Sequence, residues 1–298
     1  MKKLIFIILC TLLFANSIFA EKRIVEFWNL MGEKKYDELE TFLGNWEQEN
    51  KKDAELYVAY FNFYLQKATQ NQMTFETELP PDCKNYMKGQ NENGEEGYMC
   101  FITKYDDEMS NKAFEYIDKG ISYNPKRLDM YFGKAHFYYL RKDYKNQCEL
   151  LKKVFDLNKK NKSQWLWANN TPAKEASVDF EKTMHGYIGR WLKEKTEDSI
   201  KYAKELSVEF VKCYPKNPIA YNDAAICCIY SKDLKSAKEY FKSAYELDKS
   251  DMIILANLAY ISEDLGEIED AKKYYKLLEQ STDEQYSSMA KRKLETFQ

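Results

Sequence analysis

The chain has 298 residues, of which 44% are hydrophobic, and its formal net charge is −3. This composition excludes a globally disordered protein, and the mixed charges without a basic stripe argue against a nucleic-acid partner. With only 10 glycines and 6 prolines for tight turns, the composition favours helices over strands.

The first twenty residues have the layout of a secretory signal. Lys2 and Lys3 precede an apolar run, and the segment ends at Ala20. The run is shorter than the roughly 20 apolar residues that cross a bilayer. We therefore expect residues 1–20 to be a cleaved signal peptide and the protein to be exported, to the periplasm or cell envelope of a bacterium, or else secreted. If the segment is retained, it acts as an anchor, and this is the one membrane contact that we expect.

Apolar residues at helical spacing predict the next elements. Residues 39–46 and 57–66 each form one amphipathic helix, and another includes Ala113. The C-terminal half of the chain repeats every 34 residues, as described below. Compared with that period, the stretch between the helix of residues 57–66 and the helix that includes Ala113 is about 40 residues too long. We therefore expect an insertion at about 68–108, and its prolines and glycines predict that it is irregular.

The cysteines and histidines form no metal signature, because no CxxC pair occurs and the two histidines lie far apart. We expect no metal and no other cofactor. Cys83 and Cys100 both fall in or near the first insertion, where a disulfide would tie an irregular segment together in an oxidising compartment, and we hold the bridged and free states equally open. Cys213 and Cys227 are expected on consecutive helices, roughly 13 Å apart and beyond disulfide reach.

The C-terminal half of the chain repeats with a fixed period. Ala203, Ala237 and Ala271 recur at intervals of 34 residues. In the clearest unit, residues 217–250, an apolar helix is followed by a polar break and by a second helix with small and aromatic residues on one face. Each unit is therefore predicted to be a pair of antiparallel helices.

This pattern resembles the tetratricopeptide repeat (TPR), in which an aromatic residue, Leu-Gly and Tyr on the first helix are followed by Ala, an aromatic residue and Ala on the second. Residues 252–280 match it as well, and a weaker match begins near Tyr131. The resemblance covers most of residues 21–298. It implies an all-α fold, an α-solenoid of about six antiparallel helix pairs, in which residues 283–297 form a capping helix.

Three residues depart from the TPR pattern. Gln147 stands where the family has alanine, Trp191 where it has a small residue, and Ser207 where it has an aromatic one. Because small residues let paired helices approach closely, we expect the pair that contains Gln147 to be spaced slightly wider.

A second insertion, at about 162–183, carries Trp165 and Trp167 next to two asparagines. An exposed Trp-x-Trp could stack on a sugar or anchor a partner, whereas packing of the loop back on the helices would make both residues structural. Exposure of the two indoles discriminates between these possibilities. Exposed tryptophans favour a ligand-binding loop, and buried ones favour a scaffold.

No catalytic motif is present, since the sequence contains no GxSxG, P-loop or HExxH, and we expect no enzyme. The TPR resemblance instead implies a concave groove, lined by the first helices of successive repeats, that receives a partner segment. Some of its aromatic residues could instead complete packing between repeats. By register the groove residues are Phe132, Gly133, His136, Tyr139, Asn222, Asp223, Ile226, Ile229, Asn257, Tyr260 and Asp264.

The family's carboxylate-clamp members carry basic residues in this groove, and they are absent here, so we expect an apolar or amphipathic segment rather than a free C-terminus. The sequence therefore predicts a non-catalytic scaffold or adaptor of the cell envelope that binds another protein or a peptide segment. The alternative is a periplasmic ligand-binding protein in which the two insertions hold a peptide or a glycan.

Overall fold

The computed structural model describes residues 22–80, 83, 85–175 and 179–297. The predicted signal peptide, residues 1–20, lies outside these ranges, so its cleavage remains a prediction. Among the described helices, none is both long enough and apolar enough to cross a membrane.

The chain divides into two compact units. The first contains the described residues up to Phe137 together with Trp165–Ala173, and the second contains Tyr138–Gln164 and the described residues from Lys174 onward. The second insertion is therefore shared, because its central part belongs to the first unit although its flanks belong to the second.

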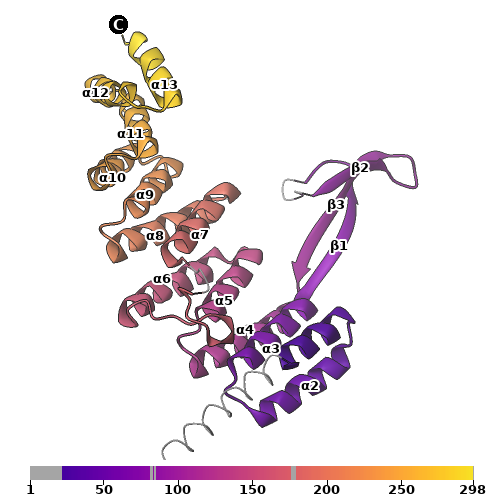
Figure 1. The fold of residues 1–298 in the computed structure, drawn as a ribbon. Helices are drawn as coiled ribbons and strands as arrows, with labels where there is room; N and C mark the ends of the chain where they lie inside the picture. The colour runs from indigo at the N-terminus through magenta and orange to yellow at the C-terminus, as the bar shows by residue number, and fades with distance from the viewer. Residues whose placement is uncertain (1–21, 81–82, 84, 176–178, 298) are drawn as a thin grey trace, which may run out of the picture. The chain divides into compact units, whose positions relative to one another are not determined.

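The first unit is built on helices whose apolar residues face one core. These helices are residues 22–32, α2 (Tyr36–Glu49), α3 (Ala54–Ala68), α4 (Asp107–Tyr123) and most of α5 (Leu128–Leu140) (Figure 1). The helices α3 and α4 approach closely at Gly120, where an added Cβ would lie 2.6 Å from Cβ of Tyr57. Tyr116 of α4 also stacks on Tyr60 of α3, with the ring centroids 4.0 Å apart. These contacts hold α3 and α4 together as one helix pair.

The first insertion is a sheet, which corrects the expectation of an irregular segment. Its strands β1 (Thr69–Glu76), β2 (Tyr86–Gln90) and β3 (Glu96–Tyr105) are antiparallel in the order β1-β3-β2. The strand β1 follows α3 directly and β3 leads into α4, so the sheet is inserted between the two helices of one pair (Figure 1). Residues 98–105 are rich in aromatic and β-branched residues, which favour strands, while the prolines lie in the connection between β1 and β2.

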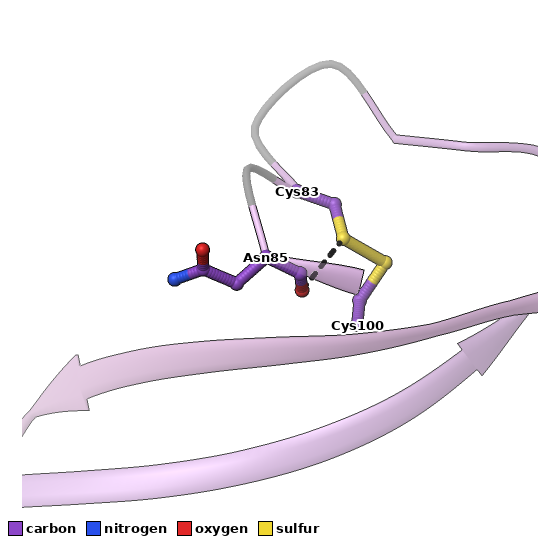
Figure 2. Close-up of a disulfide and its surroundings, with 3 residues drawn as sticks. All are labelled: Cys83, Asn85 and Cys100. Atoms are coloured by element: carbon purple, nitrogen blue, oxygen red, sulfur yellow. Dashed lines mark hydrogen bonds between the residues drawn. A yellow bond between two sulfur atoms is a disulfide. The ribbon is translucent and has the colours of Figure 1, made fainter. Parts of the chain in front are cut away.

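A disulfide joins this connection to the middle strand. Cys83 precedes β2 and bonds to Cys100 of β3, and the Sγ atom of Cys83 also lies 3.5 Å from the backbone oxygen of Asn85 (Figure 2). Both cysteines are buried. Of the two states considered from the sequence, the structure has the bridged one, and Cys213 and Cys227 are free.

Removing the bridge is expected to loosen β2 and leave the helices intact. The bridge closes a loop with a sequence separation of 17, which is worth about 3 kcal/mol. In the double variant Cys83→Ser/Cys100→Ser, hydrogen exchange should accelerate at the amides of β2 and stay unchanged in α3 and α4. Reduction of the wild-type protein should have the same effect. Unchanged protection of β2 in both samples would show that the bridge does not hold the strand.

The second insertion packs on the first unit through a short β-like contact. The backbone nitrogen of Leu128 donates to the oxygen of Leu166 at 2.9 Å, and the nitrogen of Leu166 donates to the oxygen of Lys126 at 2.8 Å. These hydrogen bonds attach the loop to the N-terminus of α5.

A buried ion-pair network lies beneath this contact. The guanidinium of Arg127 is 1% exposed, pairs with Glu55 of α3 at 2.7 Å and donates two hydrogen bonds to Asp129 at 2.8 and 2.9 Å. The backbone nitrogen of Asn169, in the loop, donates to the same Glu55 at 2.8 Å. Arg127 thus joins α3, α5 and the second insertion, and burial acts to lower its pKa while both carboxylates raise it above the ordinary value.

Replacing Arg127 with Met is expected to destabilise the first unit by about 3–5 kcal/mol, because two largely buried carboxylates lose their cation. Urea denaturation followed by circular dichroism measures the loss. The matched control is Lys242→Met, which removes a cation from an exposed i,i+3 pair with Glu239 and should behave like the wild type. Equal stability of the Arg127→Met variant would contradict a structural role for the network.

The second unit consists of consecutive antiparallel helices. They are α6 (Tyr144–Lys160), α7 (Phe180–Glu194), α8 (Glu197–Cys213), α9 (Pro218–Tyr230), α10 (Leu234–Leu247), α11 (Met252–Asp264), α12 (Ile268–Glu279) and α13 (Glu284–Glu295). Side chains cap many of the N-termini, as Asn217 does for α9 and Asp251 for α11. The repeat alanines Ala203, Ala237 and Ala271 are fully buried on α8, α10 and α12. The expected all-α, TPR-like fold is confirmed, with the small sheet as an addition.

Two of the three departures from the TPR pattern contact each other. The indole nitrogen of Trp191, on α7, donates to Oε1 of Gln147, on α6, at 2.8 Å, and both side chains are fully buried. Gln147 therefore supplies the hydrogen-bond acceptor that the buried indole N–H of Trp191 needs.

Candidate protein-binding surface

The predicted groove residues fall in both units. Phe132, Gly133 and His136 lie on the part of α5 that belongs to the first unit, whereas Tyr139 and all of α9 and α11 belong to the second. Tyr139 donates a hydrogen bond to Glu194 of α7 at 2.8 Å. The predicted residues of α9 and α11 therefore all lie in the second unit.

The Trp-x-Trp loop packs back on the first unit. Trp165 is 4% exposed and its ring lies edge-on to Tyr131, 5.7 Å away, while Trp167 contacts the ring of Phe132 at 6.3 Å. Phe132 is itself buried, so its ring is not offered to a partner as the groove prediction required. By the exposure criterion, the buried Trp165 and half-buried Trp167 favour a structural loop.

The two asparagines that follow have a conformational role. Asn169 and Asn170 both have φ of 56°, in the left-handed region that asparagine adopts more readily than most residues. They lie in the short 3₁₀ turn η1 (Ala168–Asn170) that reverses the loop.

Exposed apolar side chains follow one face of α9 and of α11. On α9 this face contains Ile219, Asn222, Ile226 and Ile229, at spacings of three and four residues that place them on one side of a helix. On α11 it contains Ile253, Asn257, Tyr260 and Asp264, at the same kind of spacing. We call these eight residues the α9–α11 face.

Four of its members are large hydrophobic residues that solvent reaches. Ile253 is 59% exposed, Ile219 47%, and Ile229 and Tyr260 39% each. Ile226 packs against the core cluster that contains Leu255 and Ala256 of α11, so both helices contribute to one packed body. The sequence prediction missed Ile219 and Ile253, although they are equivalent residues of successive repeats and extend the same helical spacing by one turn.

Tyr260 is held in place from the C-terminal side. Its ring lies 6.0 Å from that of Tyr275 on α12, and Nζ of Lys293 on α13 lies 5.6 Å from its centroid. Lys293 and Tyr275 also donate to Glu263, at 2.8 and 2.7 Å. Burial acts to raise the pKa of Glu263, but these hydrogen bonds outweigh it and hold the pKa below its ordinary value. The capping helix thus fixes one end of the α9–α11 face.

A histidine–aspartate pair joins α7 to α9. Nδ1 of His185 lies 2.8 Å from Oδ1 and 3.0 Å from Oδ2 of Asp223, whose side chain is only 4% exposed. Burial raises the pKa of Asp223 despite this hydrogen bond, and the hydrogen bond with Asp223 raises the pKa of His185. Asp223, predicted to line the groove, instead fixes the position of α7 against α9.

Within the described chain, one polar atom of α9 has no hydrogen-bond partner, and two glycines of α7 have open space beside them. The Oδ1 atom of Asn222 is buried and accepts no hydrogen bond there. On α7, a Cβ added at Gly186 or Gly189 would meet nothing within 4 Å. The unsatisfied acceptor therefore lies on α9 and the two glycines lie on α7, and the His185–Asp223 pair joins these two helices. Within the described ranges, no three His, Cys, Asp or Glu side chains gather as a metal site.

The chain is similar to one protein family and to a set of distant solved structures. The family described as the coatomer epsilon subunit matches residues 144–298, just over half of the chain. The chain belongs to this family. The coatomer epsilon match runs from α6 to α13 and includes the whole α9–α11 face. No curated protein matches the sequence.

Several solved structures resemble this coatomer epsilon family chain in part. YrrB, a TPR protein with an unusual peptide-binding site, has 15% identity and a TM-score of 0.40, and the match covers 84% of this chain and 97% of YrrB. PilF of Pseudomonas aeruginosa has 9% identity and a TM-score of 0.35 over 94% of this chain and 97% of its own. The TPR domain of Arabidopsis OM64 has 16% identity and a TM-score of 0.35 over 40% and 96%.

Replacing His185 with Gln is expected to remove a pH-dependent part of the stability. Because the folded-state pKa of His185 lies above its ordinary value of 6.5, its pair with Asp223 contributes fully below pH 6.5, and this contribution is lost as pH rises through the folded pKa. The raised pKa of Asp223 lowers the stability once its carboxyl is ionised. This cost is present in the wild type and in His185→Gln. The wild type should therefore lose stability relative to His185→Gln between about pH 6 and 8.

Urea denaturation at closely spaced pH values measures this difference. The control Asp223→Asn removes the carboxylate and should flatten the profile in the same way. Parallel pH profiles for the wild type and His185→Gln would contradict the coupling.

Proposed function

We propose that the chain is a non-catalytic protein-binding scaffold or adaptor, and that it holds a segment of its partner on the α9–α11 face. The observation that carries this proposal is the exposure of Ile219, Ile253 and Tyr260 at regular helical spacing on packed helices. A row of apolar side chains in water is unfavourable, and on a protein surface such a row marks an interaction site.

The surroundings of the face fit a rigid docking surface. The helix α11 lies in a core cluster with α9 and α12, and Lys293 and Tyr275 fix its C-terminal end through Glu263. A rigid surface binds with little ordering of its own side chains, so less of the interaction energy is lost. The family description, a subunit of a coatomer, names a component of a larger assembly, and a scaffold role agrees with it.

The cellular location is proposed from the N-terminal sequence alone. Residues 1–20 have the layout of a secretory signal, so we place the folded chain, residues 21–298, in the cell envelope. The alternative of a ligand-binding protein that uses its insertions is less favoured, because Trp165 is buried.

Site-specific photo-crosslinking tests the docking surface. A photoreactive residue is placed at Ile253 or Tyr260 of the full chain in its native cells, and captured proteins are identified by mass spectrometry. We expect one recurrent partner at both positions, and its capture at Tyr260 should be lost when Ile219 is replaced by Asp, because a charge disrupts an apolar contact.

Leu247 and Leu277 serve as matched controls, because they are leucines of the second helices α10 and α12 that are about as exposed as Tyr260. Crosslinkers there should not capture the partner. If both faces capture the same proteins, or Ile219→Asp leaves the capture unchanged, the α9–α11 face is not the binding surface.

A further inference from the structure

We propose that two copies of this chain form a dimer through the inserted sheet, by antiparallel pairing of β1 with β1 of the partner subunit. Each β1 is an edge strand, because the strand order is β1-β3-β2. The pairing joins two three-stranded sheets into one sheet of six strands. This inference goes beyond the proposed function and does not depend on the α9–α11 face.

The outer edge of β1 is open to a further strand. In the described chain, residues 70–76 make backbone hydrogen bonds to β3 alone, and the register is unbroken from Thr69 to Glu76, without a bulge. The backbone groups on the other side of β1 are therefore unpaired, and the sheet extends away from α3 and α4 (Figure 1). Such an edge binds an extended polypeptide strand.

The sequence of β1 lacks the features that protect an edge strand from pairing. Natural edges commonly carry lysine, proline or a bulge, and residues 69–75 contain no charged residue and no proline. The opposite edge strand, β2, is shorter and contains Lys88 and Gly89. Because only one edge is unprotected, β1 pairs with its own copy. This symmetric contact closes as a two-fold dimer and leaves no free β1 on which further copies could add.

The side chains of β1 are complementary to those of a second copy. In a two-fold pairing centred on Met73, the middle of residues 70–76, Gln70 lies opposite the partner subunit's Glu76, so no like charges oppose each other. Lys104 of β3 lies on the other side of Gln70. Lys104 and the partner subunit's Glu76 are therefore on one face, with their Cα atoms roughly 10 Å apart, two strand spacings. The two-fold repeats this pair, so two complementary charge pairs flank the interface.

The antiparallel arrangement keeps the helix pairs of the two copies apart. Thr69, the first residue of β1, follows α3 directly, and Tyr105, its partner in β3, leads into α4. Both helices of one copy therefore join the sheet at the same end of β1. Because the paired β1 strands run in opposite directions, the helix pairs α3 and α4 of the two copies join the six-stranded sheet at opposite ends.

Apolar side chains on one face of the sheet extend the contact. Met73 lies opposite Phe101 and Phe75 opposite Met99, so these four share a face, on which Met73 is 61% and Phe101 46% exposed. The disulfide lies on the other face, because Cys100 falls between Met99 and Phe101 along β3. Pairing of the two β1 strands places these apolar faces side by side, with Met73 of each copy at the centre, and removes apolar surface from water.

Sedimentation velocity of the purified full chain, without reductant and at about 1 to 200 μM, tests the dimer. We expect the wild type to dimerise in this range. Met73→Lys should raise the dimer dissociation constant at least about 10-fold, because it places two like charges directly opposite each other. The matched control is Met87→Lys, which changes a methionine of the same face, 51% exposed, on the protected edge β2. It should dimerise like the wild type.

A charge exchange tests the register. Glu76→Lys should raise the dissociation constant about 3-fold, because it meets Lys104 of the partner subunit with a like charge, and the double variant Glu76→Lys/Lys104→Glu should restore it. Within one chain, Lys104 pairs with Gln70, six residues and about 20 Å from Glu76, so only a contact between copies accounts for the rescue. Without rescue, the register centred on Met73 is wrong.

A wild type that stays monomeric up to about 200 μM would overturn the proposal. A dimer that Met73→Lys leaves intact forms through another surface, and one that Met73→Lys and Met87→Lys weaken equally forms by stacking of the apolar faces; either result also overturns it. Circular dichroism verifies that each variant is folded. Ile219→Asp should leave the dimer intact, so failure of the dimer and failure of the α9–α11 face appear in separate variants.

Discussion

The close approach of paired helices is the constraint on which the rest of this structure depends. Ala237 and Ala271, on second helices, lie in one core cluster with Ala225 and Ala259 of the first helices, and each is almost completely buried. Small residues at these positions let the helix backbones come together, and the larger residues then fill the space between successive pairs. One pair cannot cover its own apolar faces, so the repeats are stable only when they are stacked. Stacking also places the first helices of neighbouring repeats in one body, which allows a continuous binding surface to exist.

Both insertions leave this packing intact. The sheet lies between α3 and α4, whose contact is maintained at Gly120 and by the stacked Tyr60 and Tyr116. The central part of the second insertion belongs to the first unit, where Asn169 bonds to Glu55, one of the two largely buried carboxylates that Arg127 neutralises. The sheet therefore carries its own anchor, a disulfide, whereas the loop is held by an ion-pair network whose charged residues belong to the helical part of the first unit.

The α9–α11 face and the neighbouring helix α7 combine features that lower the stability of the free protein. Exposed isoleucines, an unsatisfied amide oxygen at Asn222 and two glycines inside α7 are each unfavourable when considered alone. They occur on first helices, while the second helices supply the fully buried repeat alanines. Functional surfaces are where such local costs concentrate, because optimising them for stability would remove the groups that a partner contacts.

The sequence by itself determined the helix pairs, their 34-residue period and the presence of both insertions, because small and apolar residues at fixed spacing report local helix packing directly. It also named Ile229 and Tyr260, which follow from repeat register. Only the tertiary structure decided that Asp223 faces His185, that Trp165 and Phe132 are buried and that Gln147 satisfies Trp191, since these contacts join residues about 35 to 45 positions apart whose meeting no local pattern records. The sheet was missed for a related reason. A strand is stabilised by the partner it pairs with, and β1 pairs with β3, which lies some 22 to 36 positions further along the chain.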